Sequence, residues 1–338
     1  MTLSATLASY RRPNLGRGLF EIAITLIPLA GLWALAWLAI RHHIWWGLLL
    51  TVPAAGFLVR LFMIQHDCGH GAFFGAKAAN DWVGRALGVL TMTPYDYWRS
   101  THAIHHATSG DLDRRTLGGV ETLTVAEYLA LSPMRRLGYR LYRHPLVMFG
   151  LGPGYMFILQ HRLPIGLMRG GWRPWVSTMA TNLAIAGGIV GMALLTGLWP
   201  FVLVHLSIVM LAATIGVWLF YVQHQFEHAY WTRSSGWSLR EAAMQGSSHY
   251  DLHPVLRWFS ANIGLHHLHH LSSRIPFYRL GRMQREHPEL QAPNRLTLIG
   301  SLRCVGLSLW DEASGRLVSF RQMRRAQAKG GGIAAAPN

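Results

Sequence analysis

The chain has 338 residues, of which 51% are hydrophobic and only 14% are charged. Soluble domains carry about 25% charged residues, so this composition excludes an ordinary soluble protein and indicates a membrane protein. The formal net charge is +16. In a chain with long apolar runs we attribute this charge to basic loops at a membrane surface, and we expect no nucleic acid partner. The two cysteines, Cys68 and Cys304, predict no disulfide framework.

Four apolar stretches are long enough to cross a bilayer, whose hydrocarbon core needs about 20 helical residues. They lie at about 19–40, 44–65, 175–198 and 200–223. Short turns join the first to the second and the third to the fourth, so we expect two helical hairpins. Arg60, the one charge in the second stretch, is close enough to its end to extend toward the interface.

The remaining segments are polar or amphipathic, and we expect those at 66–174 and 224–280 to form a helical cap. Within the cap, an apolar piece at 146–159 is too short and too rich in Gly and Pro for a full span, which favours an interfacial or re-entrant segment. Residues 1–18 form a basic N-terminal segment without the pattern of a signal peptide. Residues 281–338 are predicted to be a basic tail with a disordered end. The expected fold is therefore an all-α integral membrane protein.

The distribution of arginine predicts the orientation in the membrane. Basic residues are scarce in the two short turns and frequent in every other loop. The positive-inside rule therefore places both termini and the cap in the cytoplasm. We expect an integral protein of the bacterial inner membrane with its catalytic face on the cytoplasmic side.

Histidines recur at helical spacing in four places along the chain. Residues three and four apart share one face of a helix. The four clusters are His66 and His70; His102, His105 and His106; His224 and His228; and His266, His269 and His270. Ten imidazoles exceed the capacity of one tetrahedral metal ion, which takes about four ligands. Two metal ions that share nine or ten nitrogens are therefore the simplest interpretation, and the span count places all four clusters on one side of the membrane.

Many neutral nitrogen ligands with few carboxylates favour oxidative metal chemistry. Zinc hydrolysis needs about three protein ligands, and the Glu-x-x-His pair of soluble di-iron carboxylate proteins does not occur. Iron that activates dioxygen beside a membrane suits a substrate such as an alkyl chain. Asp67 and Glu227 lie inside two clusters and are candidates to orient ligand imidazoles through the second ring nitrogen. Ordinary polar residues at helix ends are the alternative interpretation.

Three of the clusters, with their flanks, resemble the histidine boxes of the membrane fatty acid desaturases. The boxes are HDCGH at 66–70, HAIHH at 102–106 and HHLHH at 266–270, with WRST before the second and SSRIP after the third. The resemblance covers roughly residues 65–280. The flanks are similar to those of the bacterial branch related to Δ12 acyl-lipid desaturases.

This resemblance implies a non-haem di-iron centre, a four-span bundle with a cytoplasmic cap, and the O2-dependent insertion of a cis double bond into a long acyl chain. The Δ12-type flanks favour a chain esterified in a lipid, with acyl-CoA as the alternative. It implies iron ligands at His66, His70, His102, His105, His106, His228, His266, His269 and His270. The role of His224 stays open between ligand and supporting residue, because animal acyl-CoA members carry Asn at that position. No cytochrome b5 haem motif occurs, so we expect a separate electron donor, such as ferredoxin, that docks on the basic cap.

Two other functions stay open from the sequence. A hydroxylase of the same superfamily would act on an alkyl, acyl or carotenoid substrate with the same oxidant. A metal transporter or sensor is more remote, because transporters place polar ligands near the bilayer midplane, whereas these clusters lie at helix ends and in loops. The substrate-binding residues and the double-bond position are not predicted.

Overall fold

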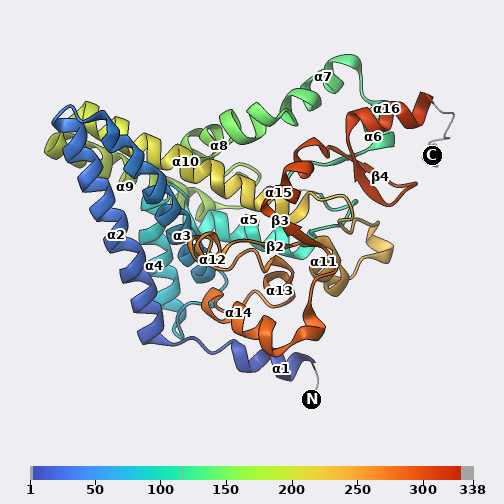
Figure 1. Ribbon diagram of the computed structural model, residues 1–338, viewed down its shortest axis with the longest axis horizontal. Coiled ribbons are helices and arrows are strands. Elements are labelled where there is room, and N and C mark those ends of the chain that lie inside the picture. Colours follow the sequence, from blue (N-terminus) through green and yellow to red (C-terminus); the bar gives the residue numbers. More distant parts are fainter. Residues whose placement is uncertain (1–2, 116, 329–338) are drawn as a thin grey trace.

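The computed structural model describes residues 3–115 and 117–328, and most of this part of the chain is helical (Figure 1). Four helical segments are long and apolar enough to cross a membrane, which confirms the four predicted stretches. They are α2 (Leu15–Arg41), η1 (Trp45–Leu50) with α3 (Thr51–Gly69), α9 (Trp172–Thr196) and α10 (Leu198–His224). The helix α2 begins before the apolar run because the Asn14 side chain accepts a hydrogen bond from the Arg17 backbone N–H at 2.8 Å.

The helix α3 lies at the centre of these four. It packs against both α2 and α10, and α10 also packs against α9. Small buried residues of α3, such as Ala54 and Ala55, allow the neighbouring backbones to approach closely. Figure 1 shows α10 running from the edge of the molecule to its centre, so that its C-terminal end meets the part of the chain outside the four helices.

A buried ion pair joins α2 to α3. The guanidinium of Arg60 pairs with the carboxylate of Glu21 and donates a hydrogen bond to the carbonyl of Trp258, over whose ring it also lies at 4.0 Å. Arg60 is buried, so the expectation that it extends to the interface was wrong. The physical reason is the short helix α12 (Pro254–Phe259), which packs against α3 and supplies the carbonyl.

The rest of the described chain is mainly helical and surrounds the C-terminal ends of α3 and α10. Before α9 it contains α4 (Lys77–Leu90), α5 (Tyr95–Thr108), α6 (Val125–Ala130), α7 (Pro133–Tyr142), η2 (Val147–Leu151), α8 (Gly152–Gly154), η3 (Tyr155–Leu159) and η4 (Gln160–Arg162). After α10 it contains η5 (Ser234–Gly236), α11 (Leu239–Gly246), α12, α13 (His266–Leu271), α14 (Phe277–Glu286), η6 (Pro288–Leu290), α15 (Leu298–Ser301), η7 (Leu302–Gly306) and α16 (Phe320–Ala328). The first helix, α1 (Leu3–Tyr10), precedes α2.

Two small sheets distinguish the structure from the expected all-α fold. The strand β1 (Leu123–Thr124) pairs in parallel with β4 (Leu309–Asp311), which forms an antiparallel hairpin with β5 (Arg316–Val318). The strand β2 (His249–Asp251) pairs in parallel with β3 (Arg295–Thr297). Strands of two or three residues are too short to show an alternating pattern, and each parallel pair joins segments that are far apart in the chain.

Within the segment predicted to be a basic tail, the residues up to Ala328 are folded. They help to build what we call the C-terminal lobe, formed by β1, β4, β5, α6, α7 and α16. Its core consists of Val125, Tyr128, Tyr139, Leu309, Val318 and Met323. The end that was expected to be disordered, 329–338, lies outside the described residues.

Candidate metal centre

Nine of the ten clustered histidines come together in two neighbouring groups. The first group contains His66, His70, His102, His106 and His269, and the second contains His105, His224, His266 and His270. Within each group, one ring nitrogen of every residue lies within 4.8 Å of all the others. The groups touch where the rings of His106 and His270 stack, with centroids 4.1 Å apart.

Four helices carry these residues. His66 lies in the last turn of α3, and His70 caps its C-terminal end. The helices α5 and α13 carry three ligand candidates each, and α10 ends at His224. The three histidines of α5, and likewise those of α13, are divided between the two groups. Residues i and i+4 belong to one group and residue i+3 to the other, because residue i+3 points away from the other two around the helix axis. On α5, for example, His105 belongs to the second group and its two neighbours to the first.

In the first group the ring nitrogens have the spacing expected for a shared ion. Nε2 of His106 lies 3.1 Å from Nε2 of His102 and 3.1 Å from Nε2 of His269. Two nitrogens that each lie about 2.0–2.1 Å from one metal ion are roughly 3–3.4 Å apart. Nε2 of His70 is buried without a hydrogen-bond partner among the described residues. Buried polar atoms normally have a partner, and a metal ion would satisfy this one.

The second group has the same spacing. Nε2 of His224 lies 3.1 Å from Nε2 of His105 and 2.9 Å from Nε2 of His266, which in turn lies 3.1 Å from Nε2 of His270. The four nitrogens thus converge on one point instead of forming separate pairs. These donor sets therefore fit two metal ions, one in each group.

Burial keeps these imidazoles neutral. It lowers the pKa of the histidines on α5 and α13, and of the residue that caps α3, well below the ordinary value, and repulsion from neighbouring imidazoles lowers the pKa further. The residues are His70, His102, His105, His106, His266, His269 and His270. Only a neutral imidazole has a free lone pair for a metal ion, so both groups are ready to bind metal at neutral pH.

Contacts at Nδ1 orient two of the rings. A carboxylate oxygen of Asp67 lies 3.2 Å from Nδ1 of His66, and the other accepts a hydrogen bond from the Phe277 backbone N–H at 2.7 Å. The carbonyl oxygen of Gly246 lies 3.2 Å from Nδ1 of His224. A proton held at each Nδ1 leaves Nε2 free for a metal ion. Asp67 therefore has the geometry of an orienting residue.

The other carboxylate considered from the sequence, Glu227, lies elsewhere. Its exposed side chain pairs with Arg316, with 3.3 Å between the charged atoms, and its carbonyl oxygen accepts a hydrogen bond from the Leu317 backbone N–H at 2.8 Å. It therefore connects the end of α10 to β5 and lies at the surface.

The structure separates the two histidines of the fourth cluster. His224 is the last residue of α10 and is buried in the second group, whereas His228 is exposed and belongs to neither group of the described chain. The i, i+4 spacing brings residues together only while a helix continues, and here the helix ends between them. Sequence reasoning preferred His228 because of the family pattern. The position of His224 at the end of the apolar run was the signal in favour of His224.

Two glycines next to the site had no assigned role from the sequence, Gly69 in the first histidine box and Gly264 before the third. The Trp98 ring stacks on the His102 ring at 4.5 Å and fills the space over Gly69, where an added Cβ would lie 2.9 Å from it. An added Cβ on Gly264 would lie 2.3 Å from the Tyr250 carbonyl oxygen. Glycine at these positions permits close approach of the neighbouring groups, and its presence in and beside the boxes is the signal that could have identified them.

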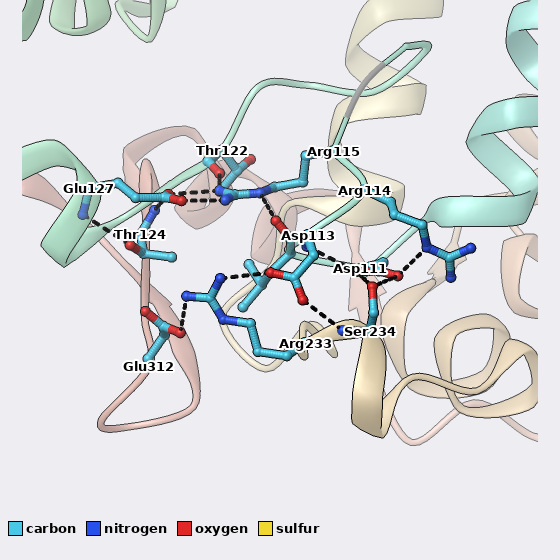
Figure 2. Close-up of polar contacts among 11 residues, drawn as sticks. Asp111, Asp113, Arg114, Arg115, Thr122, Thr124, Glu127, Arg233, Ser234 and Glu312 are labelled. Carbon is cyan, nitrogen blue, oxygen red and sulfur yellow. Dashed lines mark hydrogen bonds and ion pairs between the residues drawn. The ribbon is translucent and has the colours of Figure 1, made fainter. Parts of the chain in front are cut away.

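A polar network fixes the loop that follows α5. The buried carboxylate of Asp111 accepts hydrogen bonds from the Asp113 backbone N–H and the Ser234 hydroxyl, both at 2.9 Å. Figure 2 shows Arg233 bridging Asp113 and Glu312, at 2.8 Å to each. The network therefore connects the end of α5 to the segment after α10 and to the β4–β5 turn. These contacts fix the ends of α5 and α10, two helices that carry histidines of the metal centre.

A protein-family model described as fatty acid desaturase matches residues 43–301. This range includes every histidine of the two groups and most of the chain. The chain belongs to the fatty acid desaturase family.

Several known desaturases are similar to this one. A fatty acid desaturase of Bacillus subtilis is 43% identical over 323 residues, which cover 95% of this chain and 91% of the relative. An sn-1 acyl-lipid omega-3 desaturase (ferredoxin) of Synechocystis is 28% identical over 229 residues, or 66% of this chain and 62% of the relative. The sn-1 oleoyl-lipid 12-desaturase of Synechocystis is 27% identical over 269 residues, or 76% and 73%. This desaturase is thus an oxidoreductase with close bacterial relatives.

We expect Asp67→Ala to lower iron affinity or desaturation by roughly 10- to 100-fold, because the His66 ring loses the carboxylate that orients it. Iron per chain and product formation would be measured on the same purified sample. Glu227→Ala is the matched control, since it removes a carboxylate of the other cluster from the surface, and it should behave nearly as the wild type. Equal losses in the two variants would contradict the role of Asp67.

Proposed function

We propose that this desaturase inserts a cis double bond into the acyl chain of a lipid with two iron ions held by the two histidine groups. The observation that carries the proposal is the convergence of nine imidazoles. Six lie on α5 and α13, two lie in the last turns of α3 and α10, and His70 directly follows α3. The proposed ligands are His66, His70, His102, His106 and His269 for one iron and His105, His224, His266 and His270 for the other. Compared with the expectation from sequence, His224 replaces His228.

Bound iron would supply the dioxygen-dependent oxidation that removes two hydrogens from the acyl chain. The protein groups position and protect the reacting region. Asp67 and the Gly246 carbonyl hold the Nδ1 protons of two ligand rings, so these rings cannot turn away from the centre. Trp98 covers one side of the first group and limits the access of water to it.

A cavity of about 500 Å³ beside the first group supports a lipid headgroup as part of the substrate. Its lining includes His70, Lys77, Asp81, Arg99 and Arg274. Asp81 pairs with Lys77 and Arg99, whereas Arg274 is exposed and has no ion pair with any described residue. The guanidinium of Arg274 is therefore available to pair with an anionic phosphate. We therefore propose that the headgroup binds here, at the entrance to the metal centre. The acyl-lipid names of the Synechocystis relatives support the same carrier.

Arg274→Gln should raise the KM for an acyl lipid with an anionic headgroup by roughly three- to tenfold, the range for a partly exposed charged contact. The kcat and the iron content should not change, because Arg274 is exposed and is not one of the proposed ligands. The kinetics would be compared with those of Arg240→Gln, which removes an exposed arginine of α11 outside the cavity. A KM shift of the same size in both variants would show a general charge effect and not a headgroup site.

We also propose that the four spans form two hairpins and that the cap and both termini are cytoplasmic. The packing of α2 on α3 and of α9 on α10, together with the arginine distribution, supports this topology. A thiol reagent that does not cross the membrane should label His42→Cys, in the turn after α2, in intact cells. It should leave Arg169→Cys, in the loop before α9, unlabelled until the cells are opened. Labelling of Arg169→Cys from outside would contradict the topology.

A ferredoxin-type protein is the proposed electron donor. The Synechocystis relative whose name includes ferredoxin supports it, and a net charge of +16 complements an acidic carrier. Activity with such a donor should fall steeply as salt is added, because charge-steered association weakens with ionic strength.

Analysis of fatty acids tests the function as a whole. The chain would be expressed in a host that makes mainly saturated and monounsaturated chains, beside a variant that lacks His106. Lipids from the first host should contain a new unsaturated species that depends on oxygen and on a reductant. If only hydroxylated chains are found, or if a carotenoid changes while acyl chains do not, the hydroxylase alternative replaces this proposal.

A further inference from the structure

The helix α7 carries an apolar stripe that faces away from the rest of the described chain. Met134, Leu137 and Leu141 follow one another at helical spacing and are 78%, 52% and 55% exposed. A Cβ added to Gly138, which lies between them, would meet no atom within 4 Å. Rows of large apolar side chains in contact with water are uncommon on proteins and mark interaction sites.

Arginines border this stripe on both sides. At 3.6 residues per turn, Arg135 and Arg140 lie along opposite edges of it. Arg135 is exposed, and within the described ranges it has no hydrogen bond or ion pair. Arg140 is also exposed and donates one hydrogen bond, to the Tyr128 hydroxyl at 2.6 Å. Each cation therefore has donors left for a further partner.

The opposite side of α7 is fixed to the protein. The Tyr139 ring is buried in the core of the C-terminal lobe, and its hydroxyl donates a hydrogen bond to the Ser308 carbonyl at 2.6 Å. The helix is therefore held with the stripe outward, and turning the stripe inward would break this packing.

The exposed apolar surface continues along the chain beyond α7. Leu146, Leu151, Tyr155 and Leu159 in the following helical segment are also exposed, and this segment packs against α10 through η2 and α8. Figure 1 shows α7 and α8 in succession along the same edge of the molecule as α10. Because α10 is one of the helices able to cross a membrane, the stripe adjoins the surface that meets lipid.

We propose that α7 is an interfacial helix that binds the surface of an anionic bilayer. The stripe inserts among the acyl chains, and Arg135 and Arg140 extend to lipid phosphates on either side. An apolar face bordered by arginines is typical of helices that lie in the membrane plane. Since Leu317 of the same lobe is hydrogen-bonded to Glu227, three residues after His224, this contact also holds the ligand-bearing end of α10 close to the bilayer.

A fluorescent probe on full-length protein in proteoliposomes tests the proposal. The probe is attached to Gly138→Cys in the stripe and, as a matched control, to Arg325→Cys on the exposed face of α16 in the same lobe. The native Cys68 and Cys304 are buried, so the reagent selects the new thiol. In vesicles with anionic lipid, brominated acyl chains should quench the probe at 138 strongly. Iodide in the water should quench it several-fold less than the probe at 325.

Equal quenching of both probes by iodide would overturn the proposal, because the stripe would then lie in water. Protection from iodide without quenching by brominated chains would also overturn it and would indicate a protein partner, such as a second copy. In vesicles without anionic lipid, and in Arg135→Gln, iodide should reach the probe at 138 more readily. No change in either case would overturn the role of the arginines. The readout does not use desaturation, so it is independent of the proposed reaction.

Discussion

His106→Ala and His270→Ala should each abolish desaturation while the protein still enters the membrane. The two residues come from α5 and α13 and lie in different groups, and their rings stack at 4.1 Å where the groups meet. Either change removes a proposed ligand, so the activity should fall by more than roughly 100-fold, the upper range for loss of a residue that only supports a ligand. Insertion depends on the apolar helices, which do not change.

Metal analysis and fatty acid analysis on the same preparations provide the measurement. Wild-type protein made with ample iron is expected to hold close to two iron ions per chain, and each variant should hold less. His205→Ala is the control, because His205 lies inside α10 against Phe201 and far along the helix from the ligand end. Equal loss in all three variants would refute the assignment, as would wild-type protein that is active with zinc alone.

His224→Ala should remove iron and activity, whereas His228→Ala should keep both near the wild-type level. The reason is the end of α10, which leaves His224 buried among three other imidazoles and His228 exposed. The expected loss for His224→Ala is again more than roughly 100-fold in activity. Because the second group would lose one of its four ligands, the iron content should fall from about two toward one per chain.

His224→Asn is a useful companion to this pair. The asparagine amide nitrogen takes the place of Nδ1 and can still donate to the Gly246 carbonyl, so the backbone around the site should keep its position. If His224→Asn binds iron normally and His228→Ala does not, the family-based assignment of His228 is right and the present ligand set is wrong. Iron content distinguishes the outcomes even if all variants are poorly active.

The sequence by itself identified most of the proposed ligands and all four candidate spans. Both patterns are local. A span is one continuous apolar run, and the spacing within HAIHH determines which side chains share a helix face wherever that helix lies. The sequence also suggested Asp67 as the residue that orients His66, because the two residues are adjacent in the chain.

Only the tertiary structure decided how the ligands divide and which of two histidines joins them. Helix geometry turns His105 away from His102 and His106, but only the packing of α5 against α10 and α13 decides that His224, His266 and His270 complete its group. His224 and not His228 joins them because α10 ends at His224, and the Gly246 carbonyl of α11 orients the His224 ring. The Arg60–Glu21 pair and the folding of β4 and β5 onto β1 are equally long-range. Spacing along a helix is set by backbone geometry, but the position of one helix end against another depends on packing between residues that are far apart in the chain, which no local pattern contains.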